Sequence, residues 1–433
     1  RFRFFAHALT GQSPRLQLPT RIYALDRSAW SELVPAKRDT AGFFRPGMRE
    51  NHVLLRADGP NSEIILFHEY VHFLMSDDSV AYPLWYSEGF AELLSTIKRS
   101  PEGWTVAGAS HRIRGLRRGV DSRWALSLRD LRGESRSSVL RFYSHAWALV
   151  RYLIREREDG PRRTANELRR YLALLERGEG WDEAFEQSFG VSFGELDAAI
   201  AGLRRRRRLD AWQLPAERLP KVEEAEVTTL EGAVLAEELG WLSIVLGQYR
   251  NAETYFRAAI ETAPTRSRSH VGLGDALKFQ GRWDEAEPHY SRGLAIDDES
   301  ALNHLDYGEY LYDRALRLSE EPGREERVAK ARHHFVRSWK LDPKLPETYA
   351  VYGMSYLEEA DDLPRAVEML ERAPSHRPGE HPLQLLLARA SAAVGRRSAA
   401  IRLLARSRAH AGRSDQVADL IEQIRAEAEQ EAG

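Results

Sequence analysis

The chain has 433 residues, of which 42% are hydrophobic and 30% charged, so it is long enough for two or more domains and can bury a core in each. Its 63 basic and 65 acidic residues nearly cancel, so no overall electric field favours nucleic acid or an anionic membrane as a partner. Cysteine is absent, which excludes disulfides, thiolate metal sites and cysteine nucleophiles and leaves histidine and carboxylate side chains as metal ligands.

The start of the chain leaves the cellular compartment open. The sequence begins at Arg1 rather than Met, so we expect that an upstream segment has been removed, and a signal peptide or membrane anchor is compatible with that start. No apolar run reaches the roughly 18 residues that a membrane span needs. Periplasmic, secreted, anchored and cytoplasmic locations all remain open.

Residues 1–208 have the pattern of an α+β domain. Apolar or alternating runs predict strands at 21–25 and 53–56, and 41–44 is expected to pair with 53–56 across a turn at 46–51. Helical periodicity follows at 63–74 and again at 83–98. Residues 104–117 look irregular or strand-like.

The first of these helices contains the sequence HEYVH at 68–72. His68 and His72 are four residues apart and therefore lie on one helical face, where both imidazoles can bind one Zn²⁺. Glu69 then lies beside the metal, where a carboxylate can take a proton from water. The alternative is a helix with two ordinary histidines.

The next helix supplies a third ligand, which a tetrahedral catalytic zinc requires in addition to an open position. It contains SEGFA at 87–91, and together with HExxH this resembles the gluzincin metallopeptidases, whose (N/S)-E-G-x-A motif provides a glutamate ligand. Peptidase MA-like proteins are the most similar branch. The resemblance implies a zincin-like fold with Glu88 as the third ligand, although only 15 residues separate it from His72.

Glu92, one turn after Glu88, is the rival ligand. If Glu88 binds the metal, a carboxylate at position 92 is expected to orient a zinc-binding histidine from behind, as in thermolysin-like enzymes, or to have a plain surface or core-edge role.

Helices are also predicted at 138–157 and 163–177, and the first contains a candidate catalytic tyrosine. Gluzincin aminopeptidases place a tyrosine at a similar helix start, where it stabilises the oxyanion, and Tyr143 matches it by type and context. His145 and Ala146 depart from the Lys and Gly of that motif. Tyr143 packing as core beside Trp147 is one alternative, and His145 as the oxyanion donor is another.

Residues 47–51 partly resemble the G-x-M-E-N exopeptidase motif, but the methionine is displaced. If Glu50 bound a substrate amino terminus, the enzyme would be an aminopeptidase. The alternative is a turn between strands, with 53–56 as an edge strand that pairs with an extended peptide.

Five arginines at 204–208 end this region. Nucleic acid or anionic lipid could contact such a run, but a solvated helix end before a linker is the simpler interpretation. Residues 209–232 contain Pro215 and Pro220 and weak periodicity, which predicts that linker.

Residues 233–408 repeat themselves with the 34-residue period of tetratricopeptide repeats. Glycines at 240, 274 and 308 follow that period, and small residues, an aromatic and a closing proline or aspartate recur at matched offsets. The third copy arrives late, so 314–327 holds an insertion or a lengthened helix. Four clear repeats, one degenerate repeat and a capping helix at 409–433 predict an all-α solenoid.

The sequence therefore predicts a zinc metallopeptidase, with about one Zn²⁺ per chain, followed by a repeat solenoid that binds a peptide substrate or a protein partner. A catalytically inactive scaffold and a hydrolase of non-peptide substrates are the rival hypotheses.

Overall fold

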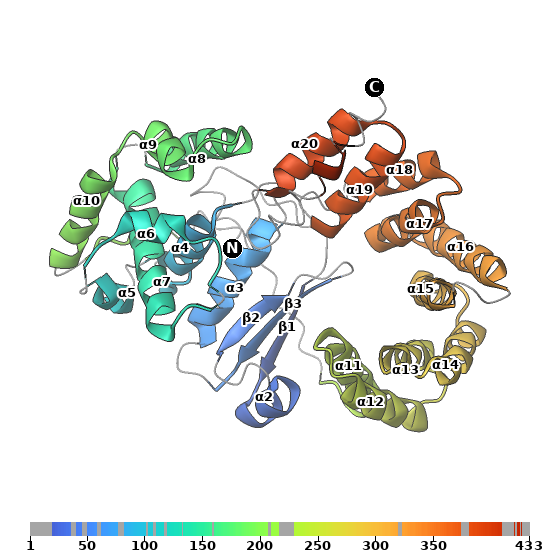
Figure 1. Ribbon diagram of the computed structural model, residues 1–433. Coiled ribbons are helices and arrows are strands. Elements are labelled where there is room, and N and C mark those ends of the chain that lie inside the picture. The colour runs from blue at the N-terminus through green and yellow to red at the C-terminus, as the bar shows by residue number, and fades with distance from the viewer. Residues whose placement is uncertain are drawn as a thin grey trace. The chain divides into compact units, whose positions relative to one another are not determined.

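Figure 1 shows the computed structural model of the chain. It describes residues 20–35, 40–45, 50–58, 62–76, 82–100, 103–106, 110–116, 119–131, 133–157, 160–206, 209–215, 229–318, 323–373 and 381–408, with a few more between 420 and 426. The chain divides into two compact units. Unit 1 combines Arg1–Asp26, Thr40–Glu223 and Arg377–Gly433, and unit 2 combines Arg27–Asp39 with Glu224–His376. The predicted boundaries treat each domain as one continuous segment, whereas these units alternate along the sequence.

Unit 1 contains a small three-stranded sheet in the order β1-β3-β2, formed by β1 (Thr20–Leu25), β2 (Gly42–Arg45) and β3 (Asn51–Arg56). β1 runs parallel to β3, and β2 pairs with β3 in antiparallel register, Phe44 opposite Val53. The predicted strands and their pairing are confirmed.

The prediction that 53–56 is an edge strand is wrong. β3 hydrogen-bonds to a strand on each side, so it is central, and its Val53 and Leu54 are completely buried. Within the described sheet, the edge strands are β1 and β2. A continuous apolar run is typical of a strand covered on both faces, so VLL suits this position better than an edge.

Helix α3 (Ser62–Ser76) packs on β2 and β3, and α4 (Leu84–Leu94) packs between α3 and α7 (Arg136–Arg151). The helix predicted at 83–98 ends at Leu94, because Ile97–Ser100 forms strand β4. Most of α4 is buried, Trp85 and Ala91 completely, so this helix forms the centre of the unit 1 core.

A second three-stranded sheet has the order β4-β5-β6, with β5 at Gly103–Val106 and β6 at Trp212–Pro215. β6 pairs antiparallel with β5, Trp212 opposite Val106. The prediction that the linker begins at 209 is therefore wrong, since part of that segment is a strand of unit 1. The prediction for 104–117 holds only for β5, because Ser110–Gly115 forms helix α5.

The remaining helices of the α+β region complete its hydrophobic core. They are α6 (Ser122–Ser127), the π-helix η3 (Tyr152–Glu156), α8 (Gly160–Glu176), α9 (Trp181–Phe189) and α10 (Phe193–Arg205). The helix predicted at 138–157 is thus α7 continued by a π-helical turn. The arginine run begins at the end of α10, where Arg206 donates to Glu156 over 2.7 Å, and residues 207–208 lie outside the described part.

Unit 2 consists of paired antiparallel helices and one short helix from the N-terminal half, α2 (Arg27–Leu33). The pairs are α11 (Gly232–Val245) with α12 (Tyr249–Thr262), α13 (Ser267–Phe279) with α14 (Trp283–Ile296), α15 (Ala301–Arg317) with α16 (Arg324–Leu341), and α17 (Pro346–Glu359) with α18 (Leu363–Arg372). The four predicted repeats are confirmed. The late third copy results from longer helices, α15 with 17 residues and α16 with 18.

The close packing of each pair follows from its glycine and its large partner. A Cβ on Gly240 would lie 2.7 Å from the Phe256 ring, and one on Gly272, in the next repeat, only 2.3 Å from the same ring. Phe256 is completely buried. One aromatic side chain therefore joins two consecutive repeats, as the repeat pattern predicts.

The degenerate fifth repeat is α19 (His381–Ala393) with α20 (Arg397–Arg408), which form their own small hydrophobic cluster and belong to unit 1. The predicted capping helix at 409–433 lies largely outside the described residues.

Candidate metal centre

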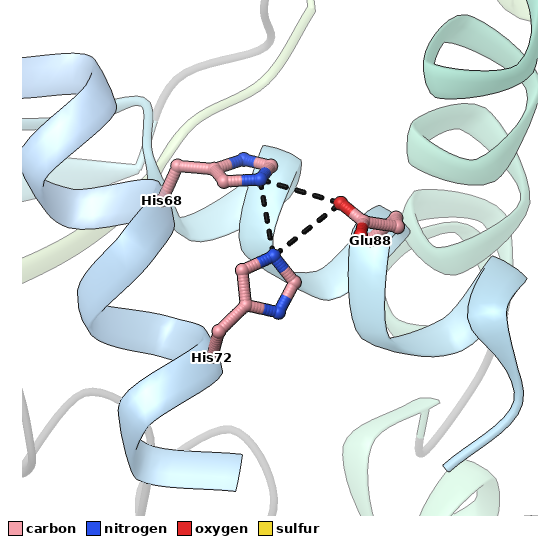
Figure 2. A group of neighbouring side chains, drawn as sticks. All are labelled: His68, His72 and Glu88. Carbon is pink, nitrogen blue, oxygen red and sulfur yellow. Dashed lines mark hydrogen bonds and ion pairs between the residues drawn. The ribbon is translucent and has the colours of Figure 1, made fainter. Parts of the chain in front are cut away.

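Two imidazoles on α3 face a carboxylate on α4 (Figure 2). The Nε2 atoms of His68 and His72 lie 3.1 Å apart. Oε2 of Glu88 lies 3.3 Å from each of them. One helical turn separates the histidines, so the helix itself places both rings on the face that meets α4.

The spacing of these three atoms suits one shared cation. Zinc–ligand distances of about 2.0–2.1 Å and tetrahedral angles require ligand atoms roughly 3.3 Å apart. Oε2 of Glu88 is buried and has no well-aligned hydrogen bond to a described residue. Among the described residues, His68, His72 and Glu88 form the one group of three or more side chains arranged to hold a metal ion. The residue types and their spacing therefore fit zinc.

The charges at this centre are strongly coupled. Burial lowers the pKa of His72, but the Glu88 carboxylate, assisted by Glu69 and Glu92, outweighs that effect and raises the pKa to about 9. Burial raises the pKa of Glu88, but His72 and His68 hold it well below its usual range. His72 is thus held as an imidazolium beside the ionised carboxylate of Glu88, and a divalent cation that binds here would displace the proton from His72.

Glycine at position 89 lets α4 approach α7 closely enough to form this centre. A Cβ on Gly89 would lie only 2.2 Å from the backbone oxygen of Ala146 and 2.6 Å from Cγ2 of Val150. The glycine of the SEGFA segment therefore holds Glu88 beside α7, which carries Tyr143.

Glu92 lies behind His68 rather than at the shared point. Its Oε1 is 3.4 Å from Nδ1 of His68, the nitrogen opposite the one that faces Glu88. Arg112 on α5 holds Glu92 with two hydrogen bonds, one of 2.6 Å from Nε to Oε2 and a second from Nη2 to Oε1. Glu92 is 3% exposed, so this bidentate pair fixes a buried carboxylate against the ring of His68.

Glu69 turns toward the small sheet. Its Oε2 accepts a 2.7 Å hydrogen bond from the backbone N–H of Phe44 on β2. The edge strand therefore orients the carboxylate that the HExxH pattern assigns to proton transfer. Neither Phe44 nor Arg112 was expected at the site, because the backbone of Phe44 leaves no sequence signal and Arg112 has no local motif.

Tyr143 lies beside this group of three candidate ligands. Its ring meets the ring of His68 edge-on at 6.0 Å, and the guanidinium of Arg112 lies 5.2 Å from its centre. Burial, followed by the nearby carboxylates of Glu88, Glu92 and Glu69, raises the pKa of the phenol well above its usual range. The hydroxyl therefore keeps its proton and can act as a hydrogen-bond donor.

The prediction that His145 can replace Tyr143 as oxyanion donor is wrong. His145 is completely buried, its Nδ1 lies 2.8 Å from the backbone oxygen of Arg141, and its Nε2 accepts from the backbone N–H of Asp121 over 3.2 Å. Both ring nitrogens are therefore occupied by backbone groups, and burial lowers the pKa of the imidazole.

Glu50 is held at the end of the sheet, away from this group of ligands. Its Oε2 pairs with Nε of Arg21 over 2.6 Å, and its Oε1 lies 3.9 Å from Nε2 of His52. The structure therefore does not bring Glu50 to the candidate ligands His68, His72 and Glu88. The turn at 46–51, predicted as the alternative to an exopeptidase motif, falls mostly outside the described residues.

Comparison with known proteins identifies the repeats. The tetratricopeptide repeat family matches residues 269–302 and, separately, residues 357–424. The C-terminal region therefore contains tetratricopeptide repeats. No curated protein matches the chain.

Several solved tetratricopeptide repeat structures are similar to the chain. A thermophilic repeat protein of Thermus thermophilus, TTC0263, is 15% identical, covers 44% of this chain and 98% of its own, and has a TM-score of 0.38. Pseudomonas aeruginosa pilF is 16% identical, covers 45% and 87%, and has a TM-score of 0.37. YrrB, described as a repeat protein with an unusual peptide-binding site, is 16% identical, covers 44% and 92%, and has a TM-score of 0.34.

Proposed function

We propose that unit 1 is a zinc-dependent metallopeptidase and that the tetratricopeptide repeats bind its protein substrate or a protein partner. The observation that carries the proposal is the meeting of two imidazole nitrogens and one carboxylate oxygen at 3.1–3.3 Å, with Glu69 on the same helix. The gluzincin-like motifs at 68–72 and 87–91 support the same assignment.

In this proposal His68, His72 and Glu88 hold the zinc ion. When bound, zinc supplies a Lewis acid that polarises a carbonyl and makes water more acidic. Glu69 takes a proton from water and delivers it to the leaving amine, while the N–H of Phe44 keeps its carboxylate in place. Tyr143 donates a hydrogen bond to the oxygen that becomes negative in the transition state.

The edge strand gives an extended peptide a place to bind. β2 pairs with β3 on one side, and its Phe44 N–H points the other way, toward Glu69. A substrate that adds to this edge as a further strand would bring its backbone next to the proton-transferring carboxylate. We therefore transfer the predicted peptide-pairing role from β3 to β2.

The test combines metal analysis with a peptide-library cleavage screen. We expect about one Zn²⁺ per chain, cleavage by the wild type, and loss of cleavage without loss of zinc in Glu69→Gln. His72→Ala should lose most of the zinc. Full zinc content in both His68→Ala and His72→Ala would refute the metal site, and equal cleavage by Glu69→Gln would refute the role of Glu69.

A second candidate function is a protein-binding scaffold without catalysis, favoured by the tetratricopeptide repeats, since proteins with these repeats bind protein partners. Zinc binding without cleavage of any peptide pool would select it. No described contact favours the aminopeptidase alternative, since Glu50 pairs with Arg21. Among the described helices, none is long and apolar enough to cross a membrane.

A further inference from the structure

A cavity of about 570 Å³ lies between α5 and the first half of α7, beside the metal centre. Three arginines and three serines line most of it: Arg112, Arg114, Arg141, Ser137, Ser138 and Ser144. A volume in this range suits a side chain together with part of a peptide backbone. None of these residues belongs to the ligand set, so the cavity has no role in the function proposed so far.

The walls of the cavity are formed by helices α5 and α7. A Cβ on Gly115 would lie 2.0 Å from Oγ of Ser144, so glycine lets α5 lie directly against α7 at one wall. Ser137 and Ser138 lie in the first turn of α7, the end of a helix that favours negative charge. The guanidinium groups, the hydroxyls of Ser137 and Ser138 and the helix N-terminus together form a set of hydrogen-bond donors for an oxyanion, whereas the Ser144 hydroxyl already donates to the backbone oxygen of Leu140.

The three arginines of the cavity differ in how far nearby carboxylates neutralise their positive charge. Arg112 is neutralised by Glu92, and Arg141 stacks on Trp124 at 4.4 Å, with Asp121 3.8 Å from its Nη2. Nε of Arg141 is buried and has no hydrogen-bond partner among the described residues. Arg114 is exposed, and no carboxylate in the described part of the chain pairs with it. The cavity therefore retains positive charge, mainly from Arg114.

Arg112 and α7 connect this cavity to the metal centre. Arg112 lines the cavity, and it also binds Glu92 and lies over the Tyr143 ring. Along α7, Ser137 and Ser138 are five to six residues before Tyr143, a distance of about 8–9 Å. An extended peptide covers this distance in two to three residues.

We propose that this cavity is a subsite for a negatively charged group of the peptide substrate, a carboxylate or a phosphate, two to three residues from the cleaved bond. The proposal rests on the metallopeptidase function proposed above. A peptide with Glu, Asp, a phosphorylated residue or its own terminal carboxylate at that distance would place its oxyanion among Arg114, Arg141, Ser137 and Ser138.

The test measures binding separately from cleavage. Zinc-loaded, full-length Glu69→Gln protein is titrated into fluorescent octapeptide pools that carry Glu, Gln or phosphoserine at one fixed position, with free or amidated C-termini. Fluorescence anisotropy gives the affinities. The fixed position differs from one set of pools to the next. At one or two of these positions we expect peptides with Glu or phosphoserine to bind roughly tenfold or more tightly than peptides with Gln, and this difference in affinity should shrink as the salt concentration is raised. The amidated pools show whether the terminal carboxylate can serve instead.

Arg114→Ala should remove most of this preference, and Arg141→Gln should reduce it. Arg136→Ala is the matched control, because Arg136 is an exposed arginine in the first turn of α7 that does not line the cavity. Equal affinity for the Glu and Gln pools, or no binding by either, overturns the proposal. A preference that survives both Arg114→Ala and Arg141→Gln also overturns it.

Cleavage by the wild type separates the two proposals. Cleavage without an acidic preference means that the subsite is wrong and the peptidase function stands. An arginine-dependent acidic preference without any cleavage means that the subsite stands and the peptidase function fails.

Discussion

Replacing Gly89 by alanine tests whether close packing of α4 on α7 holds the metal ligands together. The new Cβ would lie 2.2 Å from the backbone oxygen of Ala146, whereas ordinary carbon–oxygen contacts begin at about 3.3 Å. The two helices must therefore separate by about 1 Å. The neighbouring atom belongs to the backbone of α7, so no side-chain rotation can relieve the clash.

Two opposing free energies determine the effect on stability. Alanine favours the helix over glycine by about 1 kcal/mol, while overpacking a core costs about 1–3 kcal/mol. We expect a net loss of up to about 2 kcal/mol in the free energy of unfolding. The effect on the metal should be larger, because ligand positions must hold to about 0.2 Å and Glu88 moves with its helix. A loss of about 10 to 100-fold in zinc affinity is expected, the range found when ligand orientation is disturbed.

The assay compares Gly89→Ala with Gly202→Ala by thermal unfolding in EDTA and by zinc competition against a chromophoric chelator. Gly202 lies in α10 of the same unit, and a Cβ there would meet no atom within 4 Å. Gly202→Ala should therefore keep its zinc affinity and gain up to about 1 kcal/mol. If Gly89→Ala matches Gly202→Ala in both measurements, the close contact does not position Glu88 and the reasoning is refuted.

Three further outcomes are expected. Glu88→Ala should abolish tight zinc binding, whereas Glu92→Ala should weaken it by about 10 to 100-fold, and the reverse order in a zinc titration would make Glu92 the ligand. Burial, followed by the charges of His304 and His333, lowers the pKa of His334 to about 4, so stability is lost as pH falls below the unfolded value of 6.5. The free energy of unfolding should fall by about 1–2 kcal/mol by pH 4, after discounting for the partial solvent exposure of His334. The variant His334→Gln should have a flatter curve of Tm against pH between pH 6.5 and 4, and an unchanged slope would contradict this prediction. Phe256→Ala should lower the free energy of unfolding of unit 2 by about 3–5 kcal/mol, as measured by urea unfolding. If Phe256→Ala lowers it by less than Tyr255→Ala does, the role of Phe256 in joining two repeats is refuted.

His304, which contacts His334, adds to the same loss of stability in acid, because burial lowers its pKa as well. Nδ1 of His334 and Nδ1 of His304 lie 2.9 Å apart, and Nε2 of His304 lies 3.0 Å from the backbone oxygen of Asp298. His304 therefore donates from Nε2 and accepts at Nδ1, where His334 donates. Protonation of His304 at Nδ1 would bring two N–H groups together, so acid breaks this contact. The folded state thus binds fewer protons than the unfolded chain between about pH 4 and 6.5.

The parts of the structure that sequence predicts well depend on local spacing. The repeats follow from glycines 34 residues apart and from aromatic residues such as Phe256 that pack within a repeat and with its neighbour. The positions of His68 and His72 follow from the pitch of a single helix. In each case the interacting residues are close in sequence, so their spacing predicts the contact.

The errors come from contacts between distant segments. β3 was expected at an edge, because its parallel partner β1 is separated from it by α2 and β2, and a parallel partner gives no hairpin signal. β6 pairs with β5 although more than 100 residues lie between Val106 and Trp212, and its four residues give too short a pattern to identify a strand. Arg112 was missed for the same reason, since only the folded chain brings a counter-ion to the buried Glu92.

Helix α2 has a consequence for what happens when the chain is cut. The sequence predicts no element at Arg27–Leu33, yet Gln248 donates to the backbone oxygen of Leu33 over 2.5 Å, Tyr255 donates to Glu32 over 3.3 Å, and Trp30 is almost completely buried. This helix stays with the repeats, while the strands on both sides of it, β1 and β2, belong to the sheet of unit 1. A single proteolytic nick after β6 should therefore yield two bands on a denaturing gel but one peak on a sizing column, because the N-terminal fragment still contributes α2 to the repeat array. Co-expressed halves divided at that point should reassemble for the same reason, whereas a repeat fragment alone would lack the contacts that Gln248 and Tyr255 make with α2.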